Sequence, residues 1–124
     1  GDVSKKTVPK MCLVSAAAAG GDINTRTFIP HRVHEAIGVL GSVSVATACV
    51  MPGSSAWQVA GEQAGSGRLT LEVEHPTGFF TVEMEIDSAP GTAGLQVKRA
   101  ALLRTARLLM RGEVMVPLDN GGPV

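Results

Sequence analysis

Residues 26–42 read RTFIPHRVHEAIGVLGS, and this stretch decides the fold. It places His31, Arg32 and His34 directly ahead of residues 34–51, a segment that is apolar on nearly every side and interrupted by small residues. A helix without a polar face is typical of an element that is buried all round. The sequence therefore predicts one buried helix over about residues 34–51.

Strand-like runs lie on both sides of this segment. Residues 10–15 are mostly apolar, and residues 23–29 alternate Ile and Thr with other side chains. Residues 69–74 and 79–87 also alternate apolar with polar residues, which is typical of strands with one buried face. Pro-Thr-Gly at 76–78 supplies turn chemistry between the last two runs and predicts a hairpin. One helix among several short strands indicates the α+β class.

Length and composition exclude several classes of protein. A chain of 124 residues fits one domain, so we expect a single domain over residues 1–124. The net charge is zero and aromatic residues make up 3% of the chain. Nucleic acids and anionic membranes are bound through an excess of Lys and Arg, and bases through aromatic stacking. We therefore expect no nucleic acid and no membrane as a partner.

The cysteines and the apolar segment indicate in which cellular compartment the protein is expected. Cys12 and Cys49 are too few for a disulfide scaffold, which favours a reducing, cytoplasmic location. Residues 36–51 fall short of the roughly 20 apolar residues that a helix needs to span a bilayer. The segment is thus interpreted as core.

The basic side chains ahead of the predicted helix indicate an anion site. Free N–H groups and the helix dipole already make a helix N-terminus positive. His31, Arg32 and His34 at such a place are unfavourable unless an anion lies among them. The simplest ligand is a small carboxylate or phosphate.

Four motifs in order along the chain resemble the C-terminal part of the PrpF protein family. They are SKKTVPKM at residues 4–11, FIPHRVHEAIGVLG at 28–41, EHPTG at 74–78 and RTARLLMRGEV at 104–114. That family comprises 2-methylaconitate cis-trans isomerases and 4-oxalomesaconate tautomerases with the diaminopimelate-epimerase-like fold. The resemblance implies a β-rich sheet curled around one buried central helix, as one half of a two-domain isomerase. On this reading the chain is a C-terminal fragment, and the N-terminal domain is absent.

Residues 97–111 carry conflicting indications. Arg104, Arg107 and Arg111 lie at helical spacing among strong helix formers, so local propensity favours an amphipathic helix. In the family fold the same stretch forms strands. Because tertiary context overrides propensity, we predict strand.

The resemblance also locates the candidate site. Aligned without gaps with the epimerase motif FERGVGETLACGTGA, residues 28–42 put Gly38 at the catalytic cysteine, so a two-thiol racemisation is excluded. In the family the acid–base residues are attributed to the N-terminal domain, and no catalytic residue is expected in this chain. The remaining role is to bind and polarise a small polycarboxylate. The substrate-binding candidates are His31, Arg32, His34, the backbone amides of Gly38, Val39 and Leu40, and in addition Arg26 and Lys10.

No metal or cofactor is expected. His31 and His34 have the spacing of two ligands on one helical turn, with His75 as a third candidate. No Cys, Asp or Glu completes a recognised zinc pattern around them. The resemblance likewise implies a cofactor-free isomerase.

Two hypotheses of function remain open. The leading one is the C-terminal domain of an isomerase or tautomerase that moves a proton along an aconitate-like acid, with the isolated chain inactive. The alternative is an independent, non-catalytic module that acts by self-association or anion binding. A domain separated from its partner exposes apolar surface and sheet edges, so we expect a homodimer or higher homo-oligomer.

Overall fold

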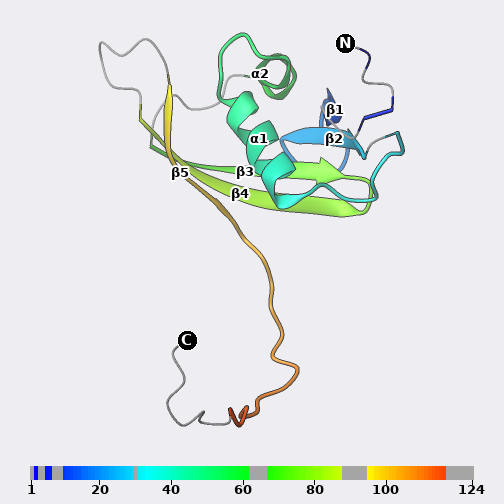
Figure 1. Cartoon of the computed structure of the whole chain (residues 1–124). Coiled ribbons are helices and arrows are strands. Elements are labelled where there is room, and N and C mark those ends of the chain that lie inside the picture. Colours follow the sequence, from blue (N-terminus) through cyan, green and yellow to red (C-terminus); the bar gives the residue numbers. More distant parts are fainter. Residues whose placement is uncertain are drawn as a thin grey trace.

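The structure is a computed structural model that describes residues 2, 5–6, 10–29, 31–61, 67–87 and 95–116. Within these residues it is an α+β arrangement of a five-stranded mixed sheet and two helices. In Figure 1 both helices lie on one side of the sheet, and the chain after the last strand runs away from this body. The elements are β1 Met11–Ser15, β2 Ile23–Phe28, α1 Val39–Cys49, α2 Ser55–Ala60, β3 Gly67–His75, β4 Gly78–Asp87 and β5 Gln96–Leu102.

The strands lie in the sheet in the order of the sequence, β1-β2-β3-β4-β5. All neighbouring pairs are antiparallel except β2 and β3, which run parallel and are joined through Ile23 with Val73 and Asn24 with Glu74. The predicted hairpin is confirmed, because β3 and β4 pair from Gly67 with Ile86 to His75 with Gly78. The strands predicted over residues 10–15 and 23–29 are also present as β1 and β2.

The core lies between the sheet and α1. Alternate positions on the strands point towards the helix, so Leu71 and Val73 of β3 are completely buried. Burying one such side chain contributes roughly 1.5–3 kcal/mol to folding. The other buried members are Ile23, Ile37, Val45, Ala46, Cys49, Val50, Ala56, Val82, Met84 and Ile86.

Helix α1 is shorter than the sequence predicts. The prediction of residues 34–51 was too long, since α1 begins at Val39 and ends at Cys49. The chain just before the helix is bound to β2: the His34 amide donates to the Thr27 carbonyl at 2.8 Å, and Val33 forms an isolated bridge with Phe28. A backbone amide that is bound to β2 in this way is not available for a helix.

The prediction that α1 is buried all round was also wrong. Ser42, Val45, Ala46 and Cys49 form its buried face. Leu40, by contrast, is 82% exposed. The composition alone did not reveal this, because no charged residue marks the outer face of the helix.

Helix α2 was not predicted. Its start has a recognisable cap, since the Ser54 hydroxyl accepts a 3.0 Å hydrogen bond from the Trp57 amide. Neither helix of the described ranges is long and apolar enough to cross a membrane. The glycine-bearing stretches 61–67 and 88–94 are interpreted from the sequence as connections, and residues 62–66 and 88–94 lie outside the described residues.

The strand predicted over residues 97–111 is correct up to Leu102 and wrong beyond it. The Leu103 amide still donates to the Thr81 carbonyl at 3.1 Å. From residue 104 to 116 the chain is neither helix nor strand, and its side chains are exposed. No strand within the described ranges lies beside this segment, so its backbone groups have no ladder to join.

Candidate functional site

A hollow of about 340 Å³ lies between the first turns of α1 and the β1–β2 pair. Its walls are mainly apolar, and Lys10 is the charged residue among them. An ammonium group at the mouth of an apolar hollow favours an anionic ligand with a hydrocarbon part. The lining residues are Lys10, Met11, Cys12, Thr27, Ile37, Leu40, Gly41, Ser44 and Val45.

The N-terminus of α1 opens at this hollow. The first backbone bond within the helix runs from the Ser42 amide to the Gly38 carbonyl at 2.9 Å. The amides of Val39, Leu40 and Gly41 come before that bond and so have no partner within the helix. Gly38 occupies the N-cap without a side-chain cap, and no acidic residue lies in the first turn. This end of the helix therefore keeps its full positive potential for an anion.

The loop that carries the predicted basic residues folds back over the end of β2. The Ile29 amide donates to the Arg32 carbonyl at 3.0 Å, next to the bridge between Phe28 and Val33. Met11 pairs with Phe28 on the other edge of β2. The loop and Lys10 thus lie at the same end of the sheet.

The three basic side chains of this loop are exposed, but they are not in the first turn of the helix. His31, Arg32 and His34 lie five or more residues before Val39. Both backbone polar atoms of Ala36 lie within 3.0 Å of Nδ1 of His34, so that ring is tied to its own loop. These three side chains are carried by the loop before α1, and none of them is among the residues that line the hollow.

The turn between β3 and β4 supports the same loop, a role that the sequence analysis missed. The Thr77 hydroxyl donates to the Glu35 carbonyl at 2.7 Å and lies 3.3 Å from Nδ1 of His75. The His75 ring stacks obliquely on Phe80, with 5.3 Å between the ring centroids. His75 therefore helps to hold the turn. The motif EHPTG at residues 74–78 was the available indication of this link.

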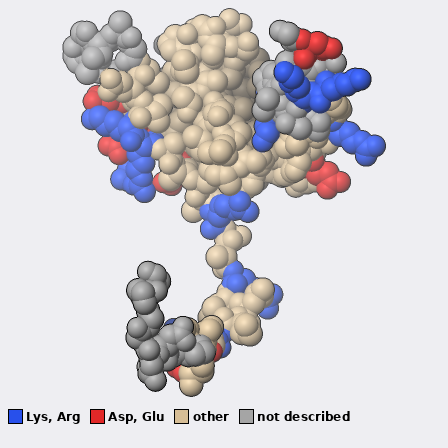
Figure 2. Space-filling view, in the orientation of Figure 1, with Lys and Arg blue, Asp and Glu red and all other residues tan. Residues whose placement is uncertain are grey.

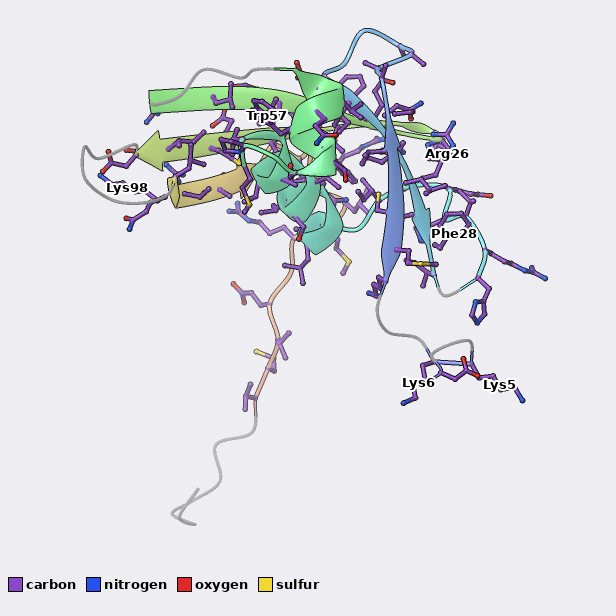
Figure 3. The ribbon with its side chains drawn as sticks, turned by 90° about the horizontal axis from the view of Figure 1, so that it is seen from above. Lys5, Lys6, Arg26, Phe28, Trp57 and Lys98 are labelled. Carbon is purple, nitrogen blue, oxygen red and sulfur yellow. The ribbon has the colours of Figure 1, made fainter. Side chains whose placement is uncertain are left out.

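Arg26 lies apart from the other candidates. Thr25 and Thr27 of β2 are buried towards α1, so Arg26 between them belongs to the opposite face of the sheet. Figure 3 shows Arg26 and Phe28 on the side of the β1–β2 pair away from the helix. The Arg26 guanidinium donates to Oδ1 of Asn24 and to the Thr25 carbonyl, each at 2.8 Å. The structure brings Lys10, Leu40 and Gly41 together at the hollow and leaves Arg26 outside it.

The position that aligns with the epimerase cysteine is roomy. A Cβ atom placed on Gly38 meets nothing within 4 Å, and Gly38 has φ −70°. A side chain thus fits at this position. Lack of space does not explain why Gly38 stands where the epimerase motif has a cysteine.

Two cysteines lie near α1 in different environments. Cys12 lines the hollow, and its Sγ accepts a 3.4 Å hydrogen bond from the Thr27 hydroxyl. The sequence analysis did not place Cys12 or Thr27 at the site. Cys49 is fully buried, and burial, reinforced by Asp22, raises the pKa of its thiol to about 11. Such a thiol is inert as a nucleophile.

The surface around the helices is uncharged. Residues 36–60 contain no Asp, Glu, Lys, Arg or His. Figure 2 shows a broad surface free of charged side chains between two charged edges of the body. The described part of the chain contains no group of three His, Cys, Asp or Glu residues arranged to hold a metal ion.

Comparison with known proteins gives a consistent result. A family model described as PrpF protein matches residues 2–117. A 4-oxalomesaconate tautomerase of Pseudomonas putida is 52% identical over 124 residues, which are 99% of this chain and 32% of that protein. A (4E)-oxalomesaconate Delta-isomerase of a Novosphingobium species is 54% identical over 116 residues, 94% of this chain and 31% of that protein.

A more distant relative is a 2-methyl-aconitate isomerase of Cupriavidus necator. It is 34% identical over 103 residues, which are 83% of this chain and 25% of that protein. The chain thus spans about a third or less of the length of these curated relatives.

Proposed function

The chain belongs to the PrpF protein family, and we propose that it forms the substrate-binding half of an isomerase acting on an unsaturated small polycarboxylate. Its relatives include proteins named as a tautomerase and as isomerases of oxalomesaconate and methyl-aconitate. Acids of this type carry several carboxylates on a short conjugated skeleton. A site for them needs positive groups around an apolar space.

The observation that carries the proposal is the open N-terminus of α1 beside Lys10. Three uncapped amides, those of Val39, Leu40 and Gly41, precede the first helical hydrogen bond. Leu40 and Gly41 line the same hollow as Lys10. One carboxylate of the substrate binds the amides, and a second one pairs with the Lys10 ammonium or with the exposed Arg32.

The proposed reaction moves a proton along the conjugated acid. Loss of the acidic C–H proton leaves a dienolate, whose negative charge spreads towards a carboxylate oxygen. Amides that hold this carboxylate stabilise the charge that develops on it, and the fixed second carboxylate orients the C–H bond towards a base. We expect that base outside these 124 residues, so the chain by itself binds without turnover.

We interpret the sheet with α1 as half of a diaminopimelate-epimerase-like fold, in which α1 is the central helix. The site then lies where the open end of α1 faces the other half. A homo-oligomer remains our expectation for the isolated chain, since apolar side chains such as Met11 and Leu13 are more than half exposed on β1.

The test is binding of aconitate to the purified chain, followed by calorimetry and by amide chemical shifts. We expect weak binding that falls as salt rises, with shifts at Val39, Leu40 and Gly41. Arg32→Ala and Lys10→Ala are expected to weaken it by roughly tenfold or more, since a charge-assisted hydrogen bond contributes about 1.5–3 kcal/mol.

The matched control for these variants is Arg99→Ala on β5. Arg99 is also exposed but does not line this hollow. Unchanged binding in both site variants, or isomerisation of aconitate by the chain alone, contradicts the proposal.

A further inference from the structure

A threonine in the turn between β3 and β4 holds the backbone that leads into α1. The Thr77 hydroxyl donates to the Glu35 carbonyl at 2.7 Å, across 42 residues of sequence. The start of the same loop is bound to β2, since the His34 amide donates to the Thr27 carbonyl at 2.8 Å. Figure 1 shows the loop passing from β2 to α1 beside this turn. The loop is thus fixed by a strand near its start and by the Thr77 side chain near its end.

Little chain separates this bond from the candidate anion site. Glu35 lies three residues before Gly38, the N-cap of α1. Three residues extend over about 10 Å at most, so a fixed Glu35 carbonyl limits where the helix can begin. Ile37 lies within this short stretch; it is 3% exposed and lines the hollow. The Thr77 bond therefore restrains both the open end of α1 and one apolar wall of the hollow.

The distances show which group receives the single proton of the Thr77 hydroxyl. The Glu35 carbonyl lies at 2.7 Å, a favourable distance for an O–H···O bond, whereas Nδ1 of His75 lies at 3.3 Å. The proton therefore points to Glu35. Nδ1 of His75 instead accepts from the Thr77 amide at 3.4 Å, and the His75 ring stacks on Phe80 with 5.3 Å between the centroids. These contacts hold Thr77 in the orientation that its bond to Glu35 requires.

We propose that Thr77 is a positioning residue for binding of the polycarboxylate. Its hydroxyl holds the Glu35 carbonyl, and the short connection to Gly38 then holds the uncapped first turn of α1 beside Lys10, so that one ligand can reach both. Thr77 is not among the residues that line the hollow, so it acts through the backbone and does not touch the ligand. This inference rests on the proposed function.

A purely stabilising role for the same bond gives a different experimental result. A bond that only stabilises the folded chain does not change the dissociation constant of a ligand, provided that nearly all molecules are folded during the measurement. A bond that fixes the end of α1 does change it. Without this bond, part of the binding free energy is spent on ordering the backbone of the site, so the ligand dissociates more readily.

The experiment is calorimetric binding of aconitate to the folded 124-residue chain and two variants. Thr77→Val removes the hydroxyl and keeps the shape of the side chain, whereas Thr77→Ser keeps the hydroxyl. We expect Thr77→Val to weaken binding by roughly threefold to tenfold, which is the net contribution of one hydrogen bond, and Thr77→Ser to bind within about twofold of wild type. Unchanged affinity of Thr77→Val overturns the proposal. Equal losses in the two variants also overturn it, because the hydroxyl is then not the cause.

Hydrogen exchange tests the same bond without any ligand. The Ser42 amide donates to the Gly38 carbonyl at 2.9 Å and so reports opening of the first turn of α1. We expect this amide to exchange roughly threefold to tenfold faster in Thr77→Val than in wild type or Thr77→Ser. Amides of the β3–β4 pair report global unfolding in the same samples. Unchanged exchange at Ser42, or acceleration no greater than that of the β3–β4 amides, overturns the positioning role.

The matched control is Thr70→Val, a second exposed threonine that lies on β3 and does not line the hollow. It is expected to change neither aconitate affinity nor exchange at Ser42, and a loss equal to that of Thr77→Val overturns the assignment. The two proposals fail in different ways. Absence of binding by wild type overturns the proposed function and any role of Thr77 in it. Wild-type binding that Thr77→Val leaves intact overturns the positioning role alone.

Discussion

The amide of Gly21 lies directly against the carboxylate of Glu74 and donates to its Oε1 at 2.8 Å. Glu74 also accepts from the amides of Ala18 at 2.8 Å and Ala19 at 2.7 Å, and it is only 4% exposed. These bonds join the glycine-rich turn after β1 to β3, across more than 50 residues of sequence. A buried carboxylate with three amide donors holds this turn in one conformation.

The close approach at Gly21 predicts that Gly21→Ala destabilises the fold. A Cβ atom there lies 2.8 Å from Cγ of Glu74 and 2.9 Å from the backbone oxygen of Glu72, which cannot move away cheaply. Overpacking of this kind costs roughly 1–3 kcal/mol. Urea unfolding of Gly21→Ala and of Gly38→Ala measures the loss of stability. Gly38→Ala is the control because a Cβ atom at Gly38 meets nothing within 4 Å. Equal midpoints for the two variants contradict the prediction.

The same bonds predict loss of stability in acid. The amides of Ala18 and Gly21 lower the pKa of Glu74 below its ordinary value. The stabilisation is complete above the ordinary glutamate pKa of about 4.3 and is lost as the pH falls through the lower, folded-state pKa. Thermal melting between pH 7 and pH 2 measures this. Glu74→Gln is expected to melt lower at pH 7 and to lose part of the acid dependence; an unchanged acid dependence argues against Glu74 as the cause.

The two thiols are expected to differ in reactivity. Cys12 is partly exposed, whereas Cys49 is buried and the pKa of its thiol is about 11. Because the thiolate is the reactive form, iodoacetamide at pH 8 should label Cys12 well before Cys49 in the folded chain. Peptide mass spectrometry checks this, with labelling in urea as the control in which both react. Equal labelling of the folded chain is the contrary result.

Substitution of Leu40 tests ligand binding separately from folding stability. It lies in the first turn of α1, lines the hollow and is 82% exposed. Leu40→Asp should leave stability unchanged or raise it by about 0.3–1 kcal/mol, since an acid favours a helix N-terminus. The same charge repels a carboxylate ligand, so aconitate binding should fall at least tenfold. Leu40→Asn is the uncharged control, and full binding by the Asp variant shows that the ligand lies elsewhere.

Several elements could be predicted from the sequence because their causes are local. Alternation over residues 69–74 and 79–87 with a Pro-Thr-Gly turn gave the β3–β4 hairpin. The family motifs identified the PrpF family, which the match over residues 2–117 confirms. Lys10 and Leu40, both predicted as binding residues, do line one hollow.

Other features depended on contacts between distant residues. The His34 amide donates to the Thr27 carbonyl instead of to a helical partner, so α1 begins after this residue. No local sequence pattern indicates this bond between distant backbone groups. The end of β5 at Leu102 depends on which strands are present to pair with it. Arg26 is separated from the hollow because successive side chains of a strand point to opposite faces, and its neighbours Thr25 and Thr27 are buried on the face towards the helix.

The sequence by itself determined the α+β class, the hairpin, the family and the local positive charge around residues 31–34, because periodicity, turn residues and motifs are properties of neighbours along the chain. Only the tertiary structure decided which of these residues line one hollow and where β5 ends. The reason is physical: the Glu74 carboxylate finds its donors at Ala18, Ala19 and Gly21, and the Thr77 hydroxyl finds the Glu35 carbonyl, only after the strands have paired.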